Sequence, residues 1–131
     1  MHWIFSLRKT KRNVRSCYDL QIWQKGMDLT MNIYEITKFF PEVEKFGLVS
    51  QMRRAAVSIP SNIAEGYGRY NKKEFLNFLR IAKGSLCELD TQLIIAAKLE
   101  FISNECFDDL CFAIDDLLYM LIAFIRGCSE K

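Results

Sequence analysis

Residues 51–69 read QMRRAAVSIPSNIAEGYGR, and this stretch decides how the chain is expected to fold. Its apolar residues recur at intervals of three or four, which is the spacing of one face of an α-helix. A helix is expected to begin near Lys45 and to end at Gly66 and Gly68. Its buried face is expected to hold Leu48, Met52, Ala55, Ile59 and Ile63.

Pro60 interrupts this helix and leaves two outcomes open. Its ring would clash with the carbonyl of Ala56, and it removes one intrahelical hydrogen bond, at a cost of about 3 kcal/mol in a plain host. The helix could kink and continue, or it could restart, with Asn62 and Glu65 spaced as a capping box. The apolar stripe stays in phase across the proline, which favours a kink at Pro60.

Three further segments show the same helical period. The first has Asp19 as a candidate N-cap and ends at Pro41. The second begins at Asn71, with Glu74 three residues later as in a capping box. The third follows Ser103 and is expected to stop at Gly127. Their stripes are Ile22, Gly26, Leu29, Ile33, Ile36 and Phe40; Phe75, Leu79, Ala82, Leu86, Leu89, Leu93 and Ala96; and Phe107, Leu110, Ile114, Leu117, Leu121 and Phe124.

No segment alternates with the period of two that a strand requires. Four amphipathic helices joined by short turns bury their stripes most simply as an antiparallel up-and-down four-helix bundle. The sequence therefore predicts an all-α fold of this architecture. The bundle domain is assigned to residues 18–131.

The motif in residues 51–69 and the run FLNFLRIAKGSLCELDTQL at residues 75–93 closely resemble a bacterial four-helix-bundle family, the 23S rRNA-intervening sequence proteins. The family pattern runs roughly Q-x-RRAA-x-SIPxNIAEG-x-GR, then FL-x-IA-x-GSL-x-EL-x-TQL. The resemblance covers about residues 18–126. It implies small helical proteins that assemble as rings, often pentameric, with a poorly defined biochemical role.

The first 17 residues differ from the rest in charge. They hold five of the 18 basic residues and no acid, which leaves 13 bases against 16 acids in the remainder. Their apolar run is too short for the roughly 7–15 residues of a signal peptide, so we expect a cytoplasmic protein. The segment is interpreted as a disordered basic extension or an upstream start, with a nucleic-acid-binding arm as the alternative.

The residue types that most enzymes of this fold need are missing. The one histidine, His2, lies in the basic extension, so neither a nucleophile–histidine pair nor a Glu-x-x-His di-iron site can form in the body. The five cysteines show no C-x-x-C pair and are interpreted as reduced thiols. The carboxylates Asp108, Asp109, Asp115 and Asp116 are interpreted as a solvated face. We therefore expect no catalytic residue, no metal and no cofactor.

The chain is more apolar than one bundle requires. Residues 117–125 are apolar on every side, yet they are too few for the roughly 20 residues of a membrane span. A homo-oligomer, by resemblance a pentamer, explains the excess, and a thick core is the alternative. Candidate interface residues are Arg53, Leu76, Phe78, Ile94, Ile95, Leu118, Ile122 and Ile125.

Basic side chains are predicted to form a strip suited to a phosphate backbone. The candidate nucleic-acid-binding residues are Arg54, Arg69, Lys72, Lys73, Arg80 and Lys83. Together these patterns predict a non-enzymatic, cytoplasmic, oligomeric helical protein that binds RNA, DNA or a nucleic-acid-handling protein and no membrane. The alternative is a structural or regulatory protein–protein assembly module that binds no nucleic acid.

Overall fold

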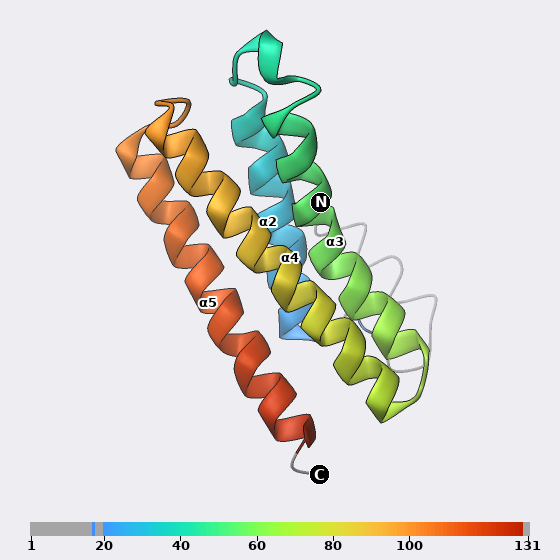
Figure 1. Cartoon of the computed structure of the whole chain (residues 1–131). Helices are drawn as coiled ribbons and strands as arrows, with labels where there is room; N and C mark the ends of the chain where they lie inside the picture. Colours follow the sequence, from blue (N-terminus) through green and yellow to red (C-terminus); the bar gives the residue numbers. More distant parts are fainter. Residues whose placement is uncertain (1–16, 18–19, 130–131) are drawn as a thin grey trace, which may run out of the picture.

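The computed structural model describes Cys17 and residues 20–129, and this part of the chain forms four α-helices and no strand (Figure 1). The helices are α2 (Gln21–Thr37), α3 (Leu48–Gly68), α4 (Lys72–Lys98) and α5 (Asn104–Ser129), with a short 3-10 turn, η2 (Glu42–Glu44), between α2 and α3. The all-helical prediction is confirmed. The predicted basic extension lies outside the described residues, apart from Cys17, which packs half-buried against the core.

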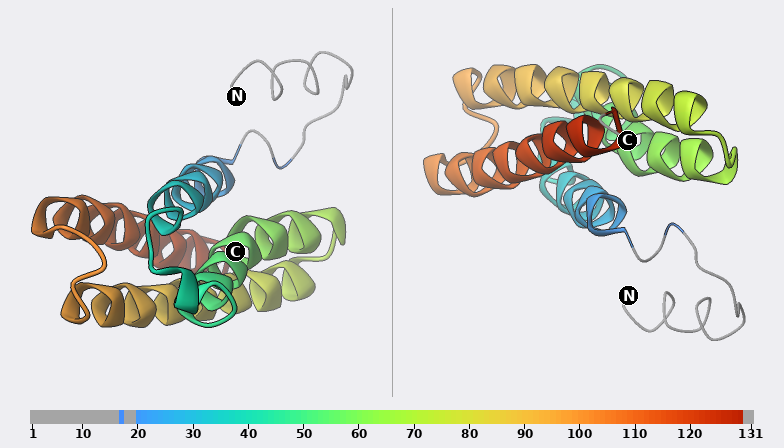
Figure 2. Two further views of the ribbon diagram at one scale, coloured as in Figure 1. Left: turned by 90° about the horizontal axis from the view of Figure 1, so that it is seen from above. Right: turned by 90° about the horizontal axis from the view of Figure 1, so that it is seen from below.

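The four helices pack around one core. Each helix contacts the next one along the chain, and α2 also contacts α5. In Figure 1 the chain climbs along α2, descends along α3, climbs along α4 and descends along α5. The views from above and from below in Figure 2 show α3 and α4 side by side, with α5 beside α4. The α3–α4 turn therefore lies at one end of the bundle, and the α2–α3 and α4–α5 connections lie at the other.

The predicted stripes form the core. Ile33, Met52, Leu86 and Leu121 are completely inaccessible to solvent, and nearly all other stripe residues are buried. The exceptions are half-buried and sit mainly near helix ends, namely Ile36, Leu48, Phe75, Phe107 and Phe124. The phase of the apolar residues thus located the core of every helix, because each helix has one face toward the others.

Helix α3 continues through Pro60 without a restart, and a side chain from α2 explains how the missing hydrogen bond is replaced. The Thr30 hydroxyl lies 3.0 Å from the carbonyl oxygen of Ala56, the acceptor that an amide at position 60 would have used. The same hydroxyl lies 2.8 Å from the Gly26 carbonyl and can donate to either oxygen. The restart alternative is therefore wrong, and the kink stays a prediction.

The α3–α4 contact is close because glycine and serine lie along it. A Cβ atom at Gly66 would sit 2.6 Å from Cβ of Phe78, so no other residue fits there without a shift of α4. Farther along, the Ser58 and Ser85 hydroxyls form a 2.8 Å hydrogen bond between the two helices. The cap predicted at Asn71 is present, since its Oδ1 accepts a hydrogen bond from the Glu74 amide at 3.0 Å.

Two predicted helix ends need correction. Helix α5 runs through Gly127 to Ser129, because a glycine in the last turn of a helix costs only about 1 kcal/mol and does not force termination. Helix α2 ends at Thr37, three residues before Phe40, although Phe40 is buried in the core. The Asp19 cap lies outside the described residues.

Candidate nucleic-acid interface

The six predicted basic residues do not form one continuous strip. Arg54 lies on α3, and Arg69 follows its last residue as the C-cap, so Arg69 is not part of the α4 face to which its spacing assigned it. Only Lys72, Lys73, Arg80 and Lys83 belong to α4. The reason is the turn at Tyr70, which breaks the helical phase between Arg69 and Lys72.

Arg69 is held by three neighbours at the α3–α4 turn. Its guanidinium lies 2.8 Å from a Glu65 carboxylate oxygen and 3.6 Å from one of Glu74. It also lies 5.1 Å from the centre of the Phe78 ring, within the range of a cation–π contact. The hydrogen bond to Glu65 raises the pKa of Arg69. These contacts fix the turn and neutralise part of its positive charge.

Tyr70 is the most exposed aromatic residue of the turn, and the sequence reasoning missed it. Its side chain is 90% exposed, and its backbone has a φ of 54°, in the left-handed region that glycine normally occupies at a helix end. A non-glycine residue there costs about 1–2 kcal/mol. An exposed aromatic in this conformation has no packing role in the single chain, which suggests that it serves a contact outside it.

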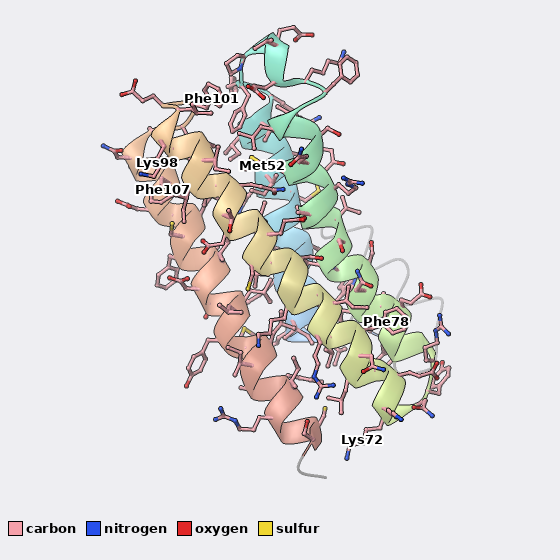
Figure 3. All side chains as sticks on the ribbon, in the orientation of Figure 1. Met52, Lys72, Phe78, Lys98, Phe101 and Phe107 are labelled. Atoms are coloured by element: carbon pink, nitrogen blue, oxygen red, sulfur yellow. The ribbon has the colours of Figure 1, made fainter. Side chains whose placement is uncertain are left out.

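Lys72 and Lys73 open α4 after Tyr70 and the cap residue Asn71, and both are exposed; Figure 3 labels Lys72 at the start of α4. Cations at a helix N-terminus are unfavourable by about 0.3–1 kcal/mol each, because the macrodipole is positive there. A cavity of about 460 Å³ lies between these lysines, Leu76 and Ser129 at the end of α5. A second cavity of about 260 Å³ lies beside Tyr70 and Lys72. The turn thus combines cations, an aromatic ring and hollows on the surface.

The remaining three cations lie away from the turn. Arg80 is exposed about 12 Å along α4 from Lys72, at 1.5 Å per residue. Lys83 is half-buried and lies two helical turns before Asp90, on the same side of α4. Asp90 interacts with Asp115 of α5, so this side of α4, and Lys83 with it, faces α5. Arg54 is about 22 Å from Arg69 along α3. These three cations do not belong to the cluster at the turn.

Some of the predicted interface residues make contacts within the chain, and others are exposed. Arg53 donates to Thr37 Oγ1 at 2.9 Å and to the Tyr34 carbonyl at 3.3 Å, so it binds the C-terminal end of α2. Phe78 packs against Gly66. Leu76, Phe78, Leu118 and Ile125 are half-buried, and Ile94, Ile95 and Ile122 are exposed by 40%, 43% and 37%.

Larger exposed apolar side chains were not singled out from the sequence. On α5, Phe112 and Tyr119 are each 76% exposed. In the α2–α3 connection, Phe39, Val43 and Phe46 are at least 80% exposed. The signal that could have found the first pair is their position opposite the α5 stripe. The connection residues carry no such periodic signal.

The acidic and thiol groups of α4 and α5 do not converge on a metal site. Burial, and then the charge of Asp115, raises the pKa of Asp90. Burial, and then nearby carboxylates, raises the pKa of Cys106 and Cys111, so these thiols are less reactive than exposed ones. Across the part of the chain that the structure describes, no three such side chains could hold a metal ion. Among the helices of residues 20–129, none contains an apolar stretch of the length that a membrane span requires.

Comparisons with known proteins agree on the family and the fold. A sequence model of the 23S rRNA-intervening sequence proteins matches residues 18–123. The chain is also similar to the crystal structure of a protein of unknown function from the S23 ribosomal protein family of Bacteroides thetaiotaomicron. That match has a TM-score of 0.75 and 24% identity, and it covers 80% of this chain and 98% of the other. No curated protein matches the chain.

Proposed function

Because the chain belongs to the family of 23S rRNA-intervening sequence proteins, we propose that it is a non-enzymatic, self-associating helical protein that binds RNA through the α3–α4 turn. One observation carries the proposal: Tyr70, 90% exposed in a conformation that favours glycine, stands between Arg69 and two exposed lysines. Cations bind phosphates, and exposed aromatic rings stack on unpaired bases.

The shape of the turn favours RNA over duplex DNA. A single exposed ring cannot stack on bases that are paired within a duplex, whereas RNA loops and bulges present unstacked bases. One copy offers only a few contacts, so binding by a single chain is expected to be weak. Self-association would repeat the turn and raise the overall affinity through multivalency.

A salt titration tests the phosphate contacts. Affinity for a structured RNA is measured between about 50 and 200 mM salt for the full chain and for a Lys72→Glu/Lys73→Glu variant. Each lost phosphate contact lowers the log–log slope by roughly one unit, so the variant should lose about two units of slope. A Lys38→Glu/Lys45→Glu variant is the matched control, because both lysines are exposed in the α2–α3 connection and the variant changes net charge equally at the end of the bundle opposite the turn (Figure 1).

The outcomes separate specific contacts from general charge. If both double variants lose the same slope, the turn is not the binding site and only net charge matters. If the full chain does not bind structured RNA at about 50 mM salt, RNA binding is wrong altogether.

A second candidate function is a protein–protein assembly module without nucleic acid. The exposed side chains of Phe39, Val43 and Phe46, at the end of the bundle opposite the turn, favour it. Replacing Phe39 and Phe46 by serine should change folding stability by no more than about 0.5 kcal/mol, as at other surface positions. Under this alternative the same variant should lose its protein partner, whereas an RNA-binding protein would keep its RNA affinity.

A further inference from the structure

The outward face of α4 has no covering element among the described residues. Figure 1 shows α4 running in front of the other helices along most of its length. At 100° per residue, one side of this helix presents Asn77, Arg80, Ile81, Gly84, Cys87, Glu88, Thr91 and Ile95. All eight are exposed, including Ile81 at 50% and Ile95 at 43%.

Gly84 lies at the centre of this face, and nothing in the single chain explains it. Gly66 and Gly26 are covered by neighbouring helices, since a Cβ atom at either position would meet side chains at 2.6 and 3.4 Å respectively. A Cβ atom at Gly84 would meet nothing within 4 Å. A glycine inside a helix costs about 1 kcal/mol relative to alanine, so an interior glycine facing open space indicates the close approach of a second backbone.

We propose that α4 packs antiparallel against α4 of a second copy of this chain, about a two-fold axis at Gly84. An antiparallel pair centred there places residue i opposite residue 168 − i. Gly84 then faces Gly84, Ile81 faces Cys87 and Asn77 faces Thr91. The centre of α4, which spans residues 72–98, is residue 85, so the two helices overlap along almost their whole length.

The charges on this face are self-complementary in the same register. Arg80 and Glu88 lie four residues to either side of Gly84, about 6 Å along the axis, so each Arg80 stands opposite Glu88 of the second copy. Neither forms an ion pair with another residue that the structure describes. Two such pairs form per contact, because a two-fold interface uses each residue twice. At an interaxial distance of about 8 Å, which glycine permits, both pairs are within side-chain reach.

This inference rests on the self-association in the proposed function and specifies one of its contacts. It removes Arg80 from the RNA-binding set. The same register brings Lys73 opposite Ile95 of the second copy, at the edge of the contact, whereas Arg69 and Tyr70 precede α4. A ring built through other surfaces could pair with a second ring through α4. Whether the α4 contact joins two single chains or two rings, it doubles the number of chains in the assembly.

Charge reversal tests the register. The molar mass of the full chain is compared by light scattering at micromolar concentration with Arg80→Glu, Glu88→Arg and the double variant. Each single reversal opposes like charges and should halve the mass, whereas the double reversal restores both pairs and should restore it. Mixing the two single variants should also restore the mass, since each supplies the charge that the other needs. Arg54→Glu, on α3, is the control and should leave the mass unchanged.

The outcomes separate this contact from self-association in general. A multimeric wild type whose mass is unaffected by either reversal would overturn the α4 contact and leave other assembly surfaces standing. A wild type that is a single chain of 15.3 kDa would overturn both. Gly84→Leu gives an independent check that leaves all charges in place: its bulk should halve the mass, and an unchanged mass would also overturn the contact.

Discussion

The α3–α4 contact and the outer face of α5 differ in whether their residues pack against other parts of the same chain. Between α3 and α4, Phe78 occupies the space beside Gly66, and the hydroxyls of Ser58 and Ser85 form a hydrogen bond. On α5, four residues of 26 are buried, while Phe112 and Tyr119 remain 76% exposed. The contact between α3 and α4 is explained within one chain, and the apolar outer face of α5 is not. The second kind of surface is where partners, including other copies, are expected.

Helix α5 is held to the bundle by one face and presents the other face to solvent. Its buried stripe faces α4 and α2, and Lys25 of α2 adds a 2.8 Å ion pair to Asp116. Both charged groups are well exposed, so this pair contributes little to stability. The packing of α5 therefore depends on its one apolar stripe.

The largest expected effect on folding comes from truncating the buried stripe. Leu86→Ala removes a side chain with no solvent exposure and should lower the free energy of unfolding by about 2–5 kcal/mol. Phe112→Ala on the outer face of α5 should change it by no more than about 0.5 kcal/mol. Urea denaturation of both variants measures the difference, and equal losses would break the comparison.

A smaller effect is expected from crowding the α3–α4 contact. Gly66→Ala forces Phe78 and α4 to move and should cost about 1–3 kcal/mol. Gly84→Ala, with open space around it, should instead stabilise the dissociated chain by up to about 1 kcal/mol. Thermal unfolding at low protein concentration distinguishes them, and a destabilised Gly84→Ala chain would show an internal role for that glycine.

Tyr70→Gly should separate folding from binding. Glycine relieves the left-handed backbone, so the free energy of unfolding should rise by about 1 kcal/mol. The same change removes the stacking ring and should weaken RNA binding by about 1–3 kcal/mol without altering its salt slope. A variant that binds RNA as well as the wild type would assign Tyr70 no part in recognition.

The smallest effect concerns pH. Burial raises the pKa of Asp90 above its ordinary value of 3.8, so the folded chain binds this proton more tightly than the unfolded chain. Stability contributed by Asp90 is therefore present at acid pH and is lost as pH rises through the two pKa values. Asp90→Asn should make the chain slightly more stable at neutral pH and should remove this part of the pH dependence, as followed by denaturation between pH 3 and pH 7.

The sequence predicted the fold well because each helix has one apolar face. The phase of residues such as Ile33, Leu86 and Leu117 indicated which side is buried, and their burial follows from packing four stripes together. The replacement of the Pro60 hydrogen bond could not be predicted, since the Thr30 hydroxyl comes from another helix, 26 residues away from Ala56. Local spacing contains no information about that contact.

The candidate site was only partly predictable for the same reason. Basic residues were recognised by type, but a turn at Tyr70 placed Arg69 on another helix and gave it two acidic neighbours. An aromatic ring can be a core residue or part of a binding surface, depending on its exposure. The spacing of apolar residues predicts exposure within a helix but not within a turn. Tyr70, Phe39 and Phe46 were missed on that account.

The most direct test of the account is the molar mass of the unmodified full-length chain, measured by light scattering at micromolar concentration. We expect a stable multiple of 15.3 kDa, because the outer faces of α4 and α5 expose apolar and small residues that one chain does not cover. A single species of 15.3 kDa at every concentration tested would contradict the central claim that these faces are contact surfaces.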